Sequence, residues 1–332
     1  MVLRFFKGFQ PANLILIVLI TIVFWFKVFF DSTNSGLFIS ENALPLYQLI
    51  VELFSYINSS FLNKLIALIL VFIQAFLVTA ISNQYSLIGH RSYMPILLFV
   101  LIILNFDNSL QIQAIYFANI LFLIAWIKIK KAQGKQQAMS NYFDASLLIG
   151  LASLFYFNFI YLVLILWANI LISRPGSFKE FSMALFGTLT TWYLFLSLYF
   201  IAYGNTYNAL SLFSFTPSFS DITQLPTSVQ IAGSFFVLLI FIANLTLFKY
   251  YVSLNINIRN NLKLFFSLFI LTVLINLFTN SSTELIYIIA VPACLFLSLF
   301  FINLKSKLLG NILFVIMFII TIGNLFFADK II

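Results

Sequence analysis

The sequence predicts an all-helical membrane protein with about eleven transmembrane helices and a cytoplasmic N-terminus. Of its 332 residues, 63% are hydrophobic and only 8% are charged, whereas charged residues make up roughly a quarter of an ordinary soluble domain. Such a small number of charges cannot cover the surface of a soluble fold of this size. Apolar runs that can cross a hydrocarbon layer of about 30 Å follow one another along the chain. We therefore expect one membrane-embedded fold with short loops.

The first apolar run, 12–30, is long and has no small-residue cleavage site after it, so we expect a retained membrane anchor. The next six spans are expected at 61–82, 93–105, 111–129, 144–157, 159–173 and 181–203. The last four spans are expected at 228–248, 264–279, 285–304 and 308–327. Between the first two spans, 46–57 is too short and too polar to cross, and we expect a helix in the outer membrane interface.

The apolar run 142–173 is too long for one simple crossing, because a helix of this length would measure about 48 Å. Lys135 precedes the run and Arg174 follows it. Since basic residues favour the cytoplasmic side, both ends of the run should face the cytoplasm. This requires a break near 157–158 that creates two short crossings; a single bent helix is the alternative.

The basic residues support this topology along the whole chain. With eleven crossings, 14 of the 17 Lys and Arg residues lie inside, and only Lys27, Lys64 and Lys330 lie outside. This bias explains the net charge of +8 without a nucleic-acid partner. Seven of the nine acids lie outside, the exceptions being Asp144 and Glu180. Topology does not require this bias of the acids, which directs the search for chemistry to the outer face.

Two outer segments are long, 31–60 and 204–227. In the first, Asp31 follows the first span directly and Glu41 lies ten residues later. A carboxylate at the membrane surface, beside an interfacial helix, suits a general base that acts on a lipid-linked substrate. The plainer interpretation is that these acids only mark the boundary with water.

On the cytoplasmic side, Arg91 and Arg174 are candidates for binding lipid phosphate, because a guanidinium can form two parallel hydrogen bonds to phosphate oxygens. Anchoring of the topology is the alternative role. Glu180 follows Ser177 by three residues, the spacing of a helix capping box, which accounts for this acid without catalysis.

Composition excludes other chemistries. With one His and one Cys in the chain, a zinc cluster of Cys and His ligands and an intrachain disulfide are ruled out. The sequence contains no GxxxxGK[ST] or GxGxxG motif, so a nucleotide-driven motor has no support. No cofactor and no metal site are evident from these residues.

The layout of the first outer loop, the interfacial helix and the paired short crossings resembles the seven-span module of polyprenyl-phosphate-dependent membrane glycosyltransferases, the GT-C fold class. The segment ASLLIGLASLFYF at 145–157 is similar to a glycine-bearing apolar segment of that class. The resemblance covers 1–203 and leaves 204–332 as a four-span region. It implies that Asp31 serves as base or metal ligand, with Glu41 second, and that a divalent cation and a polyprenyl-phosphate sugar donor take part. The paired acids usual in that class are absent from the loop.

The segments GLASLFYFNFIYLVLILW and RPGSFKEF also resemble an uncharacterised family of flavobacterial-type inner-membrane proteins. We therefore expect a multi-pass protein of a bacterial inner membrane, in contact with membrane lipids. The leading hypothesis is an outer-face glycosyltransferase. The alternatives are a non-enzymatic scaffold or accessory subunit that binds a membrane-protein partner in an envelope complex, and a lipid or small-molecule carrier.

Overall fold

The computed structural model describes residues 6–30, 44–55, 59–85, 87–88, 91–106, 110–133, 138–173, 178–204, 227–250, 256–278, 285–304 and 306–327. In these ranges the chain forms helices and no β-strand, which confirms the predicted all-helical class. The helices are α2 Pro11–Phe30, α3 Pro45–Ser55, α4 Ser60–Gln84, α5 Met94–Phe106, α6 Ala114–Ala132, α7 Met139–Ser153, η1 Phe157–Leu162, α8 Val163–Ser173, α9 Phe178–Tyr203, α11 Thr227–Tyr250, α12 Ile256–Phe278, α13 Ile286–Asn303 and α14 Lys307–Phe327.

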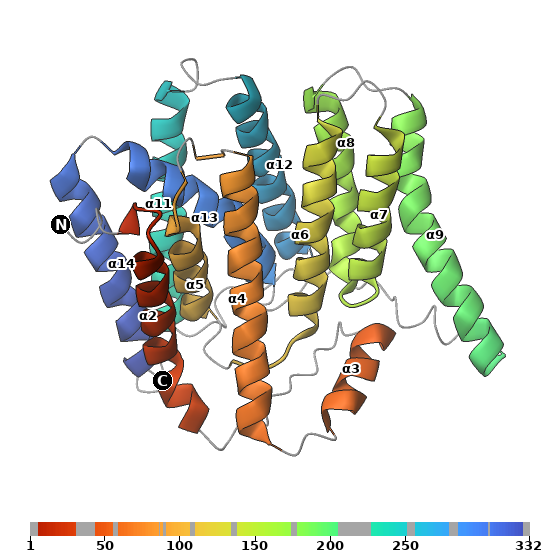
Figure 1. Ribbon diagram of the computed structural model, residues 1–332, viewed down its shortest axis with the longest axis horizontal. Coiled ribbons are helices and arrows are strands. Elements are labelled where there is room, and N and C mark those ends of the chain that lie inside the picture. The colour runs from red at the N-terminus through yellow and green to blue at the C-terminus, as the bar shows by residue number, and fades with distance from the viewer. Residues whose placement is uncertain are drawn as a thin grey trace.

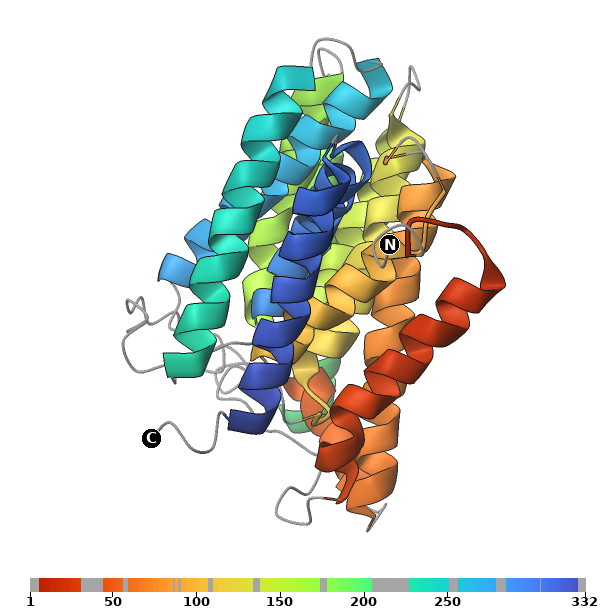
Figure 2. The same ribbon diagram turned by 90° about the vertical axis from the view of Figure 1, so that its left-hand side faces the viewer.

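The long helices lie along roughly one direction, and successive helices are joined at alternate ends (Figure 1; Figure 2). Within the described ranges, six helices are long and apolar enough to cross a membrane, namely α4, α9, α11, α12, α13 and α14. The chain therefore has the helices of a multi-pass membrane protein. Four further apolar helical segments of the described chain, 11–26, 45–54, 94–106 and 157–173, are shorter, so the total of eleven crossings stays a prediction.

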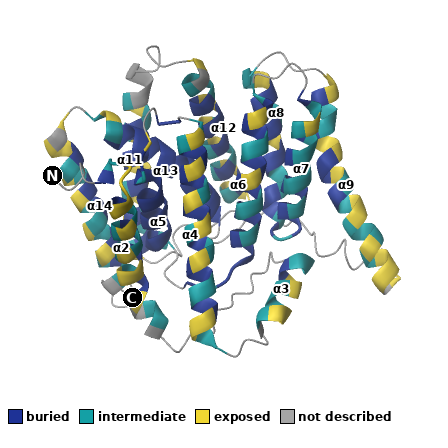
Figure 3. Cartoon of the chain, in the orientation of Figure 1, coloured by how far each residue is buried: buried dark blue, intermediate teal, exposed yellow. Residues whose placement is uncertain are grey.

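Helices α5 and α13 form the centre of the bundle, where Figure 3 shows almost continuous burial. The 13 residues of α5 span only about 20 Å, less than the hydrocarbon thickness. Its side chains are nevertheless buried from Met94 to Asn105. The Asn105 amide donates to the Thr321 hydroxyl of α14 at 2.9 Å. Because neighbouring helices surround it, α5 does not need the length that lipid contact would demand.

The run 142–173 folds as two short antiparallel helices. The 3-10 helix η1 separates α7 from α8, so the break predicted near 157–158 is present. Near the cytoplasmic end that the charge pattern predicts, the Nδ2 of Asn169 in α8 donates to the Tyr142 hydroxyl in α7 at 3.1 Å. Tyr142 lies near the start of α7 and Asn169 near the end of α8, so the chain reverses between them.

Helix α9 runs beside α7 in the same direction. The Ser146 hydroxyl of α7 donates to the Met183 carbonyl of α9 at 3.3 Å. Further along both helices, the Trp192 indole N–H donates to the Ser153 hydroxyl at 3.0 Å. Small residues at such interfaces let two helix backbones approach closely inside a membrane. The interface thus holds α9 against the short helices that precede it.

Candidate functional site

Of the four residues that the sequence singles out, one lies in the described region of the chain. Asp31, Glu41 and Arg174 fall outside the described residues, and Arg91 is exposed at the turn between α4 and α5. The acid-bearing loop has two described borders, Phe30 at the end of α2 and Leu44 before α3.

At the first border, a buried lysine holds the end of α2. Lys64, near the start of α4, is fully buried, and its Nζ donates to the Val28 carbonyl at 2.8 Å. The last carbonyls of a helix lack intrahelical partners and carry partial negative charge, which explains why an ammonium binds there. The rings of Phe29 and Phe61 contact each other beside this bond. Lys64 therefore ties α2 to α4 three residues before Asp31 in the sequence.

The sequence places Lys64 on the outer side and gives it no role. The position of this lysine near the N-terminus of a helix nevertheless indicates a specific partner. A positive charge near the N-terminus of a helix opposes the helix dipole. A lysine at that position in a helix that carries no other charge is therefore better explained by a specific partner than by exposure to water.

At the second border, α3 docks on the bundle below the ends of α6 and α7 (Figure 1). The Leu44 N–H donates to the Phe155 carbonyl at 3.5 Å. Tyr47 is fully buried, and its hydroxyl donates to the Ile112 carbonyl at 2.6 Å. The other face of α3 exposes Leu53 together with the acid Glu52 and a further leucine, Leu49. This arrangement fits the amphipathic interfacial helix that the sequence predicts.

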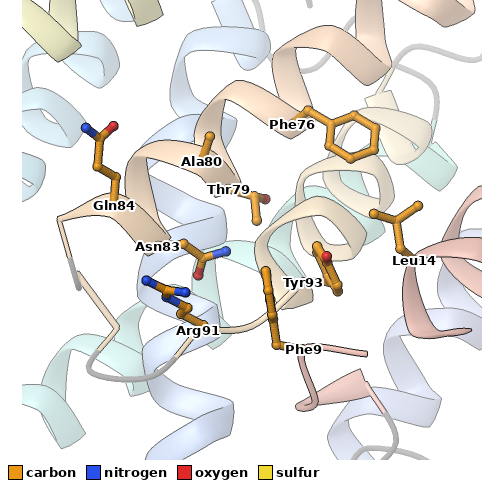
Figure 4. Close-up of a pocket in the computed structure, with 9 residues that line it drawn as sticks. All are labelled: Phe9, Leu14, Phe76, Thr79, Ala80, Asn83, Gln84, Arg91 and Tyr93. Atoms are coloured by element: carbon orange, nitrogen blue, oxygen red, sulfur yellow. The ribbon is translucent and has the colours of Figure 1, made fainter. Parts of the chain in front are cut away.

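Arg91 lines a pocket of about 500 Å³ at the opposite end of α4 (Figure 4). The pocket is formed by residues of α2, the segment before it, α4 and the α4–α5 turn: Phe9, Leu14, Phe76, Thr79, Ala80, Asn83, Gln84, Arg91 and Tyr93. Figure 4 shows Arg91, Asn83 and Gln84 at one end, and Phe76 and Leu14 at the other. The pocket is thus polar at one end and apolar at the other.

Local contacts fix the walls of this pocket. The side-chain amide of Asn83 accepts a hydrogen bond from the Ser92 N–H at 3.1 Å, which holds the residue next to Arg91. The rings of Phe9 and Tyr93 stack with their centroids 4.4 Å apart. Lys7, two residues before the lining residue Phe9, donates to the Ile302 carbonyl at 3.4 Å, and partial burial lowers the pKa of its ammonium. Among the described residues, no acidic side chain forms an ion pair with Arg91.

The pocket and the Lys64–Val28 contact at the border of the acid-bearing loop lie at opposite ends of α4, whose 25 residues span about 37 Å. The structure therefore does not bring Arg91 together with the borders of the loop that carries Asp31 and Glu41. Any role of Arg91 in lipid binding is separate from chemistry at those acids.

A second buried lysine, Lys130, lies in the last turn of α6. The charge pattern assigns Lys130 to the cytoplasmic side, and the structure shows that its side chain is buried, with only 4% exposed. Its Nζ donates to the side-chain oxygens of Asn261 in α12 and of Gln133. It also lies 5.9 Å from the ring centroids of Trp126 and Phe265. The contact joins the N-terminal region, 1–203, to the four-span remainder.

The polar first turns of α12 explain this burial. The helix begins at Ile256, eight residues before its predicted start at 264. Asn261, in these added turns, is 5% exposed and supplies an acceptor to Lys130. The sequence predicts the later start at 264 because residues 256–263 are largely polar, and a single sequence does not show which of them face another helix.

Glu180 has a structural partner at the start of α7. Its carboxylate is buried and accepts a hydrogen bond from the Ala138 N–H, just before α7, at 3.2 Å. Ser177, the other member of the predicted capping box, lies outside the described residues. Glu180 therefore helps join the starts of α7 and α9, a structural role for this acid.

Comparison with protein-family models, curated proteins and solved structures gave no match. Within the ranges that the structure describes, no group of three or more His, Cys, Asp and Glu side chains could hold a metal ion. Asp31 and Glu41, to which the resemblance assigns a divalent cation, lie outside those ranges.

Proposed function

We propose that this integral membrane protein is a polyprenyl-phosphate-sugar-dependent glycosyltransferase that acts at the outer face of a bacterial inner membrane. One observation carries the proposal: both described borders of the loop 31–43 are tied to the same end of the helical bundle. Lys64 binds the Val28 carbonyl at one border, and Leu44 binds the Phe155 carbonyl at the other. A loop anchored at both borders can hold carboxylates at a reproducible distance from the membrane surface.

In the proposed reaction, Asp31 removes the proton from an acceptor hydroxyl while the oxygen of that hydroxyl attacks the anomeric carbon of the sugar. The bond between that carbon and the phosphate oxygen breaks, and the polyprenyl phosphate leaves with the electron pair. Glu41 assists, or holds a divalent cation that neutralises the leaving phosphate. A base of this kind contributes roughly 10²- to 10⁴-fold to the rate.

The donor's lipid chain needs access from the bilayer, and α9 offers an apolar surface for it. The later half of this helix diverges from α7 in Figure 1. Its side chains there are largely exposed, among them Tyr193 at 72%, Leu198 at 67% and Ile201 at 80%. A polyprenyl chain could lie along this surface while its sugar reaches the outer loop.

The test uses the full-length protein in liposomes with radiolabelled polyprenyl-phosphate sugars and a membrane extract that supplies acceptors. Asp31→Asn and Glu41→Gln should each reduce label transfer, Asp31→Asn by about 10²- to 10⁴-fold. Glu52→Gln is the matched control, because Glu52 lies on the exposed face of α3. Equal transfer by the wild-type protein and both acid variants would contradict the proposal.

The two alternatives give different results in the same preparation. A scaffold would copurify with a membrane-protein partner in mild detergent, and substitution of either acid would leave that association unchanged. A carrier would move a labelled lipid between leaflets without transferring its sugar.

A further inference from the structure

We propose that the pocket beside Arg91 binds a phospholipid of the inner leaflet, with the lipid phosphate on Arg91 and one acyl chain in the apolar end. This site goes beyond the proposed transferase, because it lies at the far end of α4 from the Lys64–Val28 contact that borders the loop 31–43. Neither proposal depends on the other.

The shape of the pocket matches the two portions of such a lipid. Phe76 precedes Gln84 by eight residues in α4, so the apolar end lies about 12 Å deeper along the helix than the polar end. Figure 4 shows Leu14 near Phe76 at this deeper end, with Thr79 and Ala80 between the two ends. A ligand that fills the pocket must therefore carry a polar group and an apolar extension.

The polar end has hydrogen-bond donors to offer an anion. Arg91 and Gln84 are both exposed, and neither forms a side-chain hydrogen bond within the portion of the chain that the structure describes. Asn83, in contrast, is occupied by the backbone of Ser92. An arginine fork binds two oxygens of one phosphate. Positive charge without a paired carboxylate therefore favours the phosphate of a lipid over an uncharged head group.

The predicted position of Arg91 in the membrane also favours a lipid phosphate as the ligand. Arg91 belongs to the side on which 14 of the 17 basic residues are predicted to lie, where anionic lipid head groups attract Lys and Arg. Helices α2 and α4 meet where Lys64 binds Val28 and are further apart at the pocket end (Figure 2). An acyl chain would fill this wedge from the bilayer side.

The experiment measures the thermal unfolding of delipidated full-length protein in a neutral detergent. Three probes are added separately: a phosphatidylglycerol, a diacylglycerol with the same chains, and inorganic phosphate. Phosphatidylglycerol should raise the unfolding temperature of the wild-type protein most, because it alone has both the phosphate and the chains. Arg91→Gln should weaken phosphatidylglycerol binding about tenfold, and Arg91→Lys should weaken it less.

Two further variants separate the pocket from general charge. Lys131→Gln removes one exposed positive charge from the end of α6, and it should keep the wild-type response. Ala80→Trp fills the pocket and leaves Arg91 in place, so it should remove the response to phosphatidylglycerol. The proposal is overturned if Arg91→Gln responds like the wild-type protein. It is also overturned if diacylglycerol or inorganic phosphate alone gives the full stabilisation.

Discussion

Gly187 of α9 lies directly against Ser146 of α7, with no room for a side chain between the two helices. A Cβ on Gly187 would overlap the Ser146 hydroxyl oxygen and lie 2.6 Å from the Phe143 carbonyl oxygen and 2.9 Å from the Leu147 nitrogen. The last two atoms belong to the backbone of α7 and cannot rotate away. The contact therefore sets the distance between α7 and α9.

Gly187→Ala should lower the stability of the folded protein by roughly 1–3 kcal/mol, because the added methyl group forces the two backbones apart. The measurement is thermal unfolding in detergent. Gly323→Ala in α14 is the matched control, since a Cβ there meets no atom within 4 Å. A melting temperature of Gly187→Ala equal to that of the control would show that the helices do not approach as closely as described.

Lys64→Met should lower the free energy of unfolding by roughly 1.5–3 kcal/mol, the usual contribution of a hydrogen bond to a charged group. The substitution keeps an unbranched side chain but leaves the Val28 carbonyl without its donor. Unfolding by sodium dodecyl sulfate can measure the difference. Lys179→Met removes a charge from an exposed position near the start of α9 and should change stability much less. If the two variants unfold alike, the cap on α2 contributes nothing.

The contact between Lys130 and Asn261 can be tested by a double-mutant cycle. Lys130→Met, Asn261→Leu and the double variant should give a coupling energy of about 0.5–3 kcal/mol, as expected for residues that share one hydrogen-bonded network. Asn244→Leu replaces Asn261→Leu in the control cycle, because the Asn244 amide donates within its own helix, to the Ile240 carbonyl. Coupling of equal size in the control cycle would argue against a specific contact between α6 and α12.

Reporter fusions test the predicted topology. Fusions after Lys135 and Arg174 should report inside, because loops rich in Lys and Arg stay on the cytoplasmic side. A fusion after Asp221 should report outside, because one further crossing separates it from Arg174. A fusion after Arg174 that reports outside would contradict the reversal of the chain between α7 and α8. In that case every later loop would lie on the other side of the membrane.

Helix positions were largely predictable from the sequence. The predicted span 61–82 became α4, Ser60–Gln84, and the predicted span 308–327 became α14, Lys307–Phe327. The reason is that apolar runs in this chain end at polar residues, and the helices end there too. The reversal between α7 and α8 was also predictable, because basic residues flank both ends of the run.

The environment of individual polar residues was less predictable. The charge pattern gives Lys64 and Lys130 only a side of the membrane, whereas the structure buries both because a distant helix supplies an acceptor to each. Val28 is 36 residues from Lys64 and Asn261 is 131 residues from Lys130. Contacts at such separations depend on how helices pack, which periodicity and composition do not encode. Arg91 was identified from its chemistry alone, and the pocket around it became visible only in three dimensions.

The burial of α5 has a consequence for how the chain is made. A 13-residue apolar segment is too short to be held stably across a bilayer by its own contacts with lipid. Its main neighbour, α13, begins at Ile286, so most of the chain must be synthesised before α5 acquires its final surroundings. Until α13 has been synthesised, α5 must occupy a position different from its final one. A protein truncated before α13 should consequently be degraded, even though every helix that precedes the truncation is present.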